Sequence, residues 1–331
     1  MRELELQYKK IFLDYVTDQT ERNLYIGQNF ARQLIRKNVP PEEVVSMHKK
    51  AMIKVFPDAM KELYMACDFL IEVMVQYGMA HREHRSLLQK QEELRTEMNI
   101  ATSIQKTLLK TIVPSLQAID IGMISIPVRD INGDYVHFSQ ENDKFVKLAV
   151  TDVVGKGVPA ALCMSMVKYG LETLEYACEN PSNVLEALNK VIERSVDDSM
   201  FVSMFYGHYD IQNSTFSYAS AGHEPALYYC SKQDTFHELK AEGLLLGIVP
   251  EMSYSHYNIP LEVGDMVVIM TDGVTEFRKN EELDSREVIV SLINKHKHLT
   301  AQQLCLLLHK EIERIQNFKL TDDFTVVILK K

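Results

Sequence analysis

The sequence of 331 residues predicts an α+β protein in which a helical N-terminal part precedes a layered domain of sheets and helices. Three observations predict this. Apolar residues recur at helical spacing through about the first 80 positions, residues 82–112 contain no glycine or proline, and short β-like apolar runs predominate beyond Pro114. Two domains are an ordinary expectation for this length. We therefore divide the chain into residues 1–82, 83–117 and 118–331.

The first part contains the pattern of four amphipathic helices. The first helix spans the apolar positions from Tyr8 to Val16, and the second covers about 21–37. The third begins at Pro40-Pro41, where proline and two acidic residues suit a first helical turn, and the fourth follows Pro57. Four helices with short joints predict an antiparallel bundle.

The second part carries an imperfect heptad repeat. Four apolar residues recur every seven positions, with two glutamines and a methionine at the intermediate positions: Leu87, Leu94, Ala101 and Leu108, with Gln91, Met98 and Gln105. Polar residues at these positions weaken a coiled coil. The pattern predicts a helical, coiled-coil-like connector that pairs weakly or packs against a neighbouring domain. An ordinary amphipathic helix within one continuous domain is the alternative.

The third part has nine segments with the apolar or alternating pattern of strands, at 119–126, 135–139, 145–151, 200–209, 215–220, 225–230, 254–259, 265–271 and 323–329. Helical periodicity interrupts them near 158–178, 181–195, 285–295 and 301–317. Clusters of strands separated by helical pairs favour an α+β layered sandwich over a regular βαβ alternation.

Composition and charge limit the classes of function. The net charge is −10, and residues 118–331 alone carry 19 basic and 31 acidic side chains, which argues against nucleic acid as a partner. Bound cations could neutralise part of this excess, or it is simply a solvated acidic surface. The sequence has no secretory signal, no apolar run of transmembrane length and no Cys-x-x-Cys pair, so we expect a cytoplasmic protein without membrane contact.

One stretch, residues 148–160, organises the third part. An apolar strand ends at Val150, Thr151-Asp152 follows, and Gly155 and Gly157 then turn the chain. Three other places also set an aspartate beside a β-like run: Gly133-Asp134-Tyr135, Met270-Thr271-Asp272-Gly273 and Thr321-Asp322-Asp323-Phe324-Thr325. A single Asp before Gly is often only a turn former. Four separated strand ends that offer short carboxylates predict one shared site.

The residue types at these strand ends favour a particular chemistry. Carboxylates without Cys or His partners prefer hard cations such as Mg²⁺ or Mn²⁺ to zinc. Two such cations can share a bridging carboxylate and a water, lower the pKa of that water and hold a phosphoryl group for in-line attack. The sequence has no Cys-x5-Arg phosphatase loop, no Asp-x-Asp-x-Thr and no Gly-x4-Gly-Lys-Ser/Thr loop. Covalent phosphatase and nucleotide-kinase mechanisms are therefore unsupported.

Five motifs carry a resemblance to a known family: Gly133-Asp134-Tyr135, Asp152-Val-Val-Gly-Lys-Gly, Ala221-Gly222-His223-Glu224-Pro225, Thr271-Asp272-Gly273 and Asp322-Asp323-Phe324-Thr325. In this order they resemble the PPM metal-dependent serine/threonine phosphatases, in the bacterial branch typified by the stage II sporulation phosphatase. The helical part, with its Pro40-Pro41-Glu42-Glu43, resembles the members of this branch that act in the general stress response. The resemblance implies an α-β-β-α layered sandwich for 118–331 and a regulatory, partner-binding role for 1–82.

The resemblance also implies metal ligands, which as a set are the catalytic residues because they act through a metal-bound water. Asp152 is the expected bridging ligand of two divalent cations, Mn²⁺ or Mg²⁺, helped by the backbone carbonyl of Val153. Asp134 is the expected further ligand of the second cation. Asp272 and Asp322 are those of the first.

Other residues of the motifs have open roles. Asp323 stands where many relatives have asparagine, so its role as a metal ligand is left open. His223 either orients a loop near the site or has a structural role in its turn. No basic residue matches the phosphate-binding arginine of eukaryotic relatives, so phosphate binding is expected to rest on the metals.

The function implied by the resemblance is dephosphorylation of a phosphorylated anti-anti-sigma factor, as a positive regulator of the general stress sigma factor. A switch-type kinase homologue would bind the N-terminal domain and activate the enzyme, and the bundle and heptad suggest a homodimer. The alternative from another class is a catalytically inactive scaffold that binds partners and relays the signal. A calcium-binding structural module is a third possibility, although no EF-hand loop is present.

Overall fold

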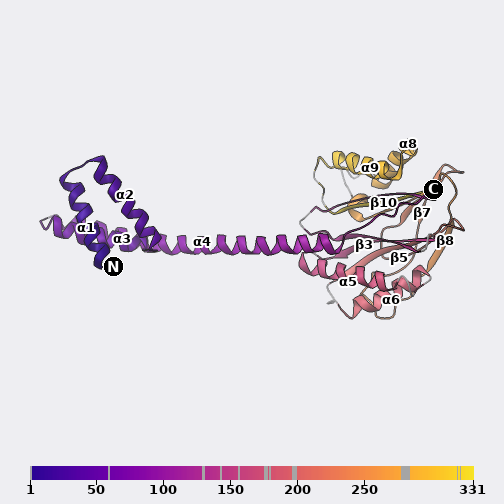
Figure 1. Ribbon diagram of the computed structural model, residues 1–331, viewed down its shortest axis with the longest axis horizontal. Coiled ribbons are helices and arrows are strands. Elements are labelled where there is room, and N and C mark those ends of the chain that lie inside the picture. The colour runs from indigo at the N-terminus through magenta and orange to yellow at the C-terminus, as the bar shows by residue number, and fades with distance from the viewer. Residues whose placement is uncertain are drawn as a thin grey trace. The chain divides into compact units, whose positions relative to one another are not determined.

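The computed structural model consists of two compact units, Met1–Thr96 and Glu97–Lys331 (Figure 1). It describes residues 2–58, 60–128, 131–141, 144–155, 157–174, 178, 180–195, 200–276, 284–318, 320 and 322–331. Helix α4 belongs to both units, and every strand among the described residues lies in the second.

The first unit is helical, as its periodicity predicts. Its helices are α1 (Arg2–Thr17), α2 (Glu21–Arg36), α3 (Pro41–Val55) and the first part of α4 (Lys61–Leu108). The Thr20 side chain caps α2 by accepting from the backbone N–H of Asn23, and Pro41 occupies the first turn of α3. A small core of four buried apolar side chains joins the first three helices: Leu4, Phe30, Leu34 and Met47.

Helix α4 is continuous through the position at which the sequence suggests a boundary between bundle and connector. It runs for 48 residues, and no glycine or proline occurs between Gly78 and Pro114 to interrupt it. The heptad residues Leu87 and Leu94 are exposed. Among the described residues, no helix has both the length and the apolar content that crossing a bilayer requires.

The second unit contains two antiparallel sheets of five strands each. The first sheet has the order β1-β10-β9-β6-β7, formed by β1 (Asp120–Ile126), β10 (Phe324–Lys330), β9 (Met266–Met270), β6 (Ala226–Cys230) and β7 (Thr235–Leu239). The second has the order β2-β3-β4-β5-β8, formed by β2 (Asp134–Glu141), β3 (Phe145–Val154), β4 (Phe201–Asp210), β5 (Thr215–Ala221) and β8 (His256–Pro260).

Two helical layers enclose the sheets, which confirms the predicted α-β-β-α sandwich (Figure 1). Helices α5 (Val158–Leu174) and α6 (Pro181–Glu193) pack on the sheet of β2 to β5. Helices α8 (Ser285–His296) and α9 (Ala301–Ile315) pack on the sheet of β9 and β10. A third core fills the space between the sheets. The central strands are apolar on both faces because both faces are buried.

The differences from the predicted elements are local. The edge strand β7 was not predicted, because its sequence, Thr-Phe-His-Glu-Leu, is largely exposed and has few apolar residues. The short helix α7 (Asp272–Thr275) was also not predicted, since one turn has no periodicity. Helix α5 ends at Leu174, and the predicted extension towards 178 includes 175–177, which lie outside the described residues.

Gly122 provides a test of how closely β1 approaches α9. A Cβ atom at Gly122 would lie 2.2 Å from the carbonyl carbon of Ala301 and 2.4 Å from its oxygen. We expect Gly122→Ala to lower the free energy of unfolding of the second unit by about 1–3 kcal/mol, because backbone must move. Thermal melting of the full chain measures this effect. Gly27→Ala, where the nearest atom is the Ile11 Cγ2 at 4.0 Å, is the control. Equal melting of Gly122→Ala and wild type would contradict the close approach.

Candidate active site

The aspartates that the sequence singles out lie at one end of the space between the two sheets. Asp134 begins β2 and is paired in register with Asp152 of β3, so their side chains lie on the same face of one sheet. Asp272 follows β9, and Asp322 precedes β10, in the other sheet. The fold thus places two carboxylates from each sheet at the same end of the sandwich.

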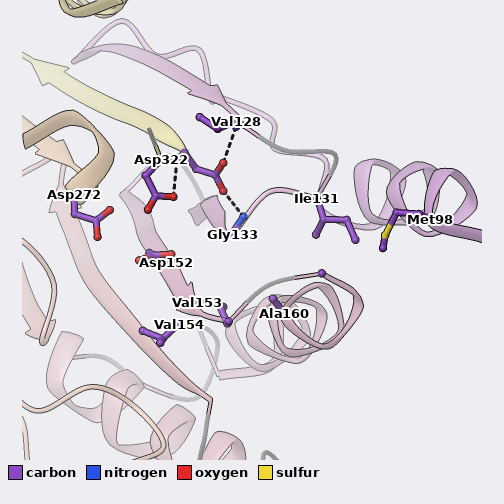
Figure 2. A pocket seen from close by; sticks show the side chains of 13 residues that line it. Met98, Val128, Ile131, Gly133, Asp152, Val153, Val154, Ala160, Asp272 and Asp322 are labelled. Carbon is purple, nitrogen blue, oxygen red and sulfur yellow. Dashed lines mark hydrogen bonds between the residues drawn. The ribbon is translucent and has the colours of Figure 1, made fainter. Parts of the chain in front are cut away.

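Three of the predicted ligands face one cavity. Asp152, Asp272 and Asp322 line a cavity of about 530 Å³ and point into the same space (Figure 2). The remaining lining is Asp323 with apolar residues and glycines: Met98, Val128, Ile131, Gly133, Val153, Val154, Gly155, Gly157 and Ala160. None of these described lining residues is Lys or Arg, so the cavity is acidic.

Asp134 has a different position from the other three. Its side chain is 4% exposed, and its Oδ2 accepts a hydrogen bond of 2.8 Å from the Thr271 hydroxyl. It lines a separate cavity of about 290 Å³ together with Gln105 and Asn132. The bond to Thr271 connects the two sheets, because Thr271 directly follows β9.

Asp323, whose role the sequence left open, holds two loops in place. Its Oδ1 accepts from the backbone N–H of Val128 at 2.7 Å, and its Oδ2 accepts from the backbone N–H of Gly133 at 2.6 Å (Figure 2). A Cβ atom at Gly133 would lie 3.3 Å from that Oδ2 and 3.5 Å from Asp152 Oδ1. Asp323 therefore fixes a tight approach of the Gly133 loop to Asp152.

Burial and like charge act together on the carboxylates. Burial raises the pKa of Asp152 to about 7, with further contributions from Asp272, Asp322 and Asp323. Burial and the neighbouring Asp152 keep the pKa of Asp134 well above its ordinary value. Burial and Asp322 also raise the pKa of Asp272. Neighbouring carboxylates thus oppose ionisation of Asp134, Asp152 and Asp272, and a bound cation would relieve this repulsion.

The donor set fits hard divalent cations, since it offers carboxylate oxygens and neither thiolate nor imidazole. As the side chains stand, no three Asp, Glu, His or Cys residues in the described part of the chain are arranged so that they could hold a metal ion. The repulsion between the carboxylates opposes a closer arrangement until a cation neutralises it.

Gln105 contributes to the site in a way that its heptad position did not reveal. It is 5% exposed, its Nε2 donates to the carbonyl oxygen of Asn132 at 2.9 Å, and its Oε1 accepts from the Asn132 N–H at 3.2 Å. Lys168 of α5 also donates to the carbonyl oxygen of Leu108, the last residue of α4. The end of α4 is thereby attached to the loop that precedes Asp134 and to α5.

His223 is buried, and its Nδ1 lies 2.9 Å from the Ser203 Oγ. Its loop is formed by Gly222, whose φ of 63° is in the left-handed region that favours glycine. His223 thus anchors the loop between β5 and β6 to strand β4.

Comparison with solved structures identifies the fold. The SiaA-PP2C domain of Pseudomonas aeruginosa has a TM-score of 0.63 at 17% identity, covering 73% of this chain and 98% of that chain. A structure of RsbX in complex with magnesium has a TM-score of 0.51 at 18% identity, covering 66% of this chain and 98% of that chain. The second unit therefore has the fold of the PP2C-type phosphatases.

Sequence comparison then identifies the family. The model for stage II sporulation protein E (SpoIIE) matches residues 142–331, and the model for the N-terminal domain of the phosphoserine phosphatase RsbU matches 6–80. Phosphoserine phosphatase RsbU of Bacillus subtilis is 42% identical over 328 residues, which is 99% of this chain and 98% of that protein. The chain belongs to the RsbU family of PP2C-type, metal-dependent protein phosphatases. The family resemblance inferred from the five motifs and the helical part is confirmed.

The raised pKa of Asp152 predicts how the metal-free protein responds to pH. Because its pKa of about 7 in the folded state exceeds the ordinary value of 3.8, its ionisation destabilises the fold progressively as the pH rises from 4 to 8. We expect Asp152→Asn to be more stable than wild type at pH 8 by up to about 4 kcal/mol, with little difference near pH 4.

Thermal melting in chelator at about pH 4.5 and about pH 8 measures the effect. Glu251→Gln, which changes an exposed carboxylate, is the control. A variant no more stable than wild type at pH 8 would show that the site does not store this repulsion.

Proposed function

We propose that this protein is a metal-dependent serine phosphatase that dephosphorylates a phosphorylated anti-anti-sigma factor and thereby activates the general stress sigma factor in the cytoplasm. One observation carries the proposal: carboxylates from both sheets face a single acidic cavity. This chain is also similar over nearly its whole length to a phosphoserine phosphatase. The rival, a catalytically inactive scaffold, would be favoured by loss of one of the aspartates, and all four expected ligands are present.

The proposed metal centre holds two divalent cations, Mn²⁺ or Mg²⁺. Asp152 would bridge both, with the carbonyl oxygen of Val153 beside it, Asp272 and Asp322 would complete the first site, and Asp134 would serve the second. The acidic cavity and the magnesium complex of RsbX support this assignment. Asp134 is the most buried of the four, and its Oδ2 accepts a hydrogen bond from Thr271. Asp323 is left out, because both of its oxygens accept backbone hydrogen bonds.

When bound, such cations supply an activated water and positive charge for the phosphoryl oxygens. The chain's own residues orient and separate the carboxylates through the Thr271–Asp134 and Gly133–Asp323 hydrogen bonds. A phosphate dianion would be repelled by the aspartates alone, and the described lining offers no Lys or Arg to offset this. The exposed apolar side chains of Val128 and Val154 would contact the polypeptide around the phosphoserine.

Regulation is proposed to reside in the helical part. Residues 1–82 would bind a switch-type kinase homologue as the activator, 83–117 would connect this domain to the phosphatase domain of 118–331, and the protein would act as a homodimer. The match of residues 6–80 to the RsbU N-terminal domain supports the first assignment. The bonds between Gln105 and Asn132 support the second, since they attach the connector to a loop of the site.

Phosphate release from a phosphoserine anti-anti-sigma protein, with Mn²⁺ or with chelator, tests the function. We expect turnover only with Mn²⁺, and a loss of about 100-fold or more in Asp152→Asn and Asp272→Asn, because each removes charge that stabilises the transition state through the cations. Asp210→Asn, at the end of β4 and outside the acidic cavity, should retain turnover. Turnover that is unchanged by chelator would exclude the metal mechanism, and no turnover with any metal or activator would favour the scaffold.

The connector provides a separate prediction, because its two glutamines have different surroundings. Gln105→Leu removes two hydrogen bonds to the Asn132 backbone, each worth about 1 kcal/mol, so we expect lower activity with and without the activator. Gln91 is exposed, and Gln91→Leu should strengthen pairing of connector helices and raise the basal rate.

Phosphatase rates with and without the activator measure both effects, and Thr96→Pro should abolish activation by breaking α4. Glu92→Gln, at an exposed position of the same helix, is the control. A Thr96→Pro variant that responds like wild type would make the connector a passive tether.

A further inference from the structure

His223 lies in the loop between β5 and β6, which connects the two sheets. Strand β5 belongs to the sheet of Asp152, and β6 belongs to the sheet of β9 and β10. A Cβ atom at Gly222 would lie 2.8 Å from the Leu245 Cδ2, and the His223 N–H donates to the Ser220 Oγ at 3.2 Å. These contacts fix the loop so that only 8% of His223 is exposed.

One ring nitrogen of His223 contacts the strand beside Asp152. Its Nδ1 lies 2.9 Å from the Ser203 Oγ. Ser203 of β4 is paired in register with Asp152, which is paired in turn with Asp134. Because directly opposed residues of an antiparallel pair share a face, Ser203, Asp152 and Asp134 form one row across three strands. The His223 imidazole is hydrogen-bonded to Ser203, the residue at the β4 end of this row.

The other ring nitrogen is directed away from this row. Burial lowers the pKa of His223 to about 4, and the backbone carbonyl of Met270 opposes this shift. Met270 ends β9 and stands two residues before Asp272. The Nε2 is buried and has no hydrogen-bond partner of ordinary geometry within the described ranges. A neutral imidazole with its proton on Nε2 can accept a hydrogen bond from the Ser203 hydroxyl at Nδ1 and donate one from Nε2 toward the other sheet.

We propose that His223 is a positioning residue that spans the two sheets and sets the separation of Asp152 from Asp272. This rests on the proposed metal centre. The Thr271–Asp134 and Gly133–Asp323 bonds are two further ties between the sheets at this end. A buried Nε2 without a partner costs free energy, and a small approach of β9 would let it bond to Met270. Cation binding, which removes the repulsion between Asp152 and Asp272, favours the same approach.

The position of the pair separates this role from a catalytic one. Neither Ser203 nor His223 is among the described residues that line the acidic cavity. Their effect on cation binding therefore passes through the strands that carry Asp152 and Asp272. Groups that orient metal ligands in this indirect way typically contribute 10–100-fold in metal affinity or activity.

The test is Mn²⁺ titration of the chelator-stripped full chain, followed by thermal melting and, separately, by phosphate release. We expect the Mn²⁺ concentration for half-maximal stabilisation to rise about 10-fold or more in His223→Ala and by less in Ser203→Ala. The double variant should be no worse than His223→Ala, since the pair acts as one unit. His223→Gln, whose amide offers both a donor and an acceptor, should recover part of the affinity. His237→Ala, an exposed histidine of β7, is the matched control.

The outcomes separate the two levels of the proposal. If wild type is not stabilised by Mn²⁺, the metal centre is wrong, and the role of His223 falls with it. If wild type is stabilised and all His223 and Ser203 variants have the same Mn²⁺ midpoint, only the role of His223 is overturned. A lower metal-free melting temperature with an unchanged midpoint would make His223 a loop anchor only. If His223→Ala does not fold, His223→Gln and Ser203→Ala decide the question by the same midpoint.

Discussion

Repulsion between neighbouring carboxylates is the constraint on which the second unit depends. Asp152 and Asp134 belong to one sheet, and Asp272 and Asp322 to the other, so bringing the sheets together also brings like charges together. The apolar core between the sheets supplies the favourable free energy that opposes this repulsion. Hydrogen bonds from Thr271 to Asp134 and from Gly133 to Asp323 then fix the distance near the site. Electrostatic repulsion thus destabilises one end of a sandwich whose core is well packed.

The sandwich and the location of the site could be predicted from the sequence for a physical reason. Central strands such as β3 and β9 are buried on both faces, which produces the apolar runs that the sequence shows. Asp272 follows β9, whereas Asp134 begins β2 and Asp322 precedes β10. Asp152 lies inside β3, which continues to Val154 instead of ending before this residue as the sequence suggested. All four aspartates are still close to strand ends, and the ends of packed strands meet. The edge strand β7 lacked this signal because only one of its five residues is buried.

Contacts between distant parts of the chain could not be predicted in the same way. Gln105 looked like a weak point in a heptad, but its partner is a backbone group 27 residues away. Asp323 looked like a doubtful ligand, and its two oxygens bind the N–H groups of Val128 and Gly133. Asp134 shared a motif pattern with the other aspartates, although its side chain lines a different cavity. Sequence pattern places a residue on an element, whereas hydrogen bonds depend on which loops meet.

The loop at Gly133 connects several of these features. Its N–H donates to Asp323, its carbonyl accepts from the Val153 N–H at 3.1 Å, and the preceding Asn132 is bonded to Gln105. Thermodynamic linkage makes such a connection reciprocal. If a conformational change at the end of α4 alters the affinity for cations, then cation binding shifts the equilibrium of that conformational change by the same free energy. A divalent cation would then act as an effector of any partner that binds at the end of α4.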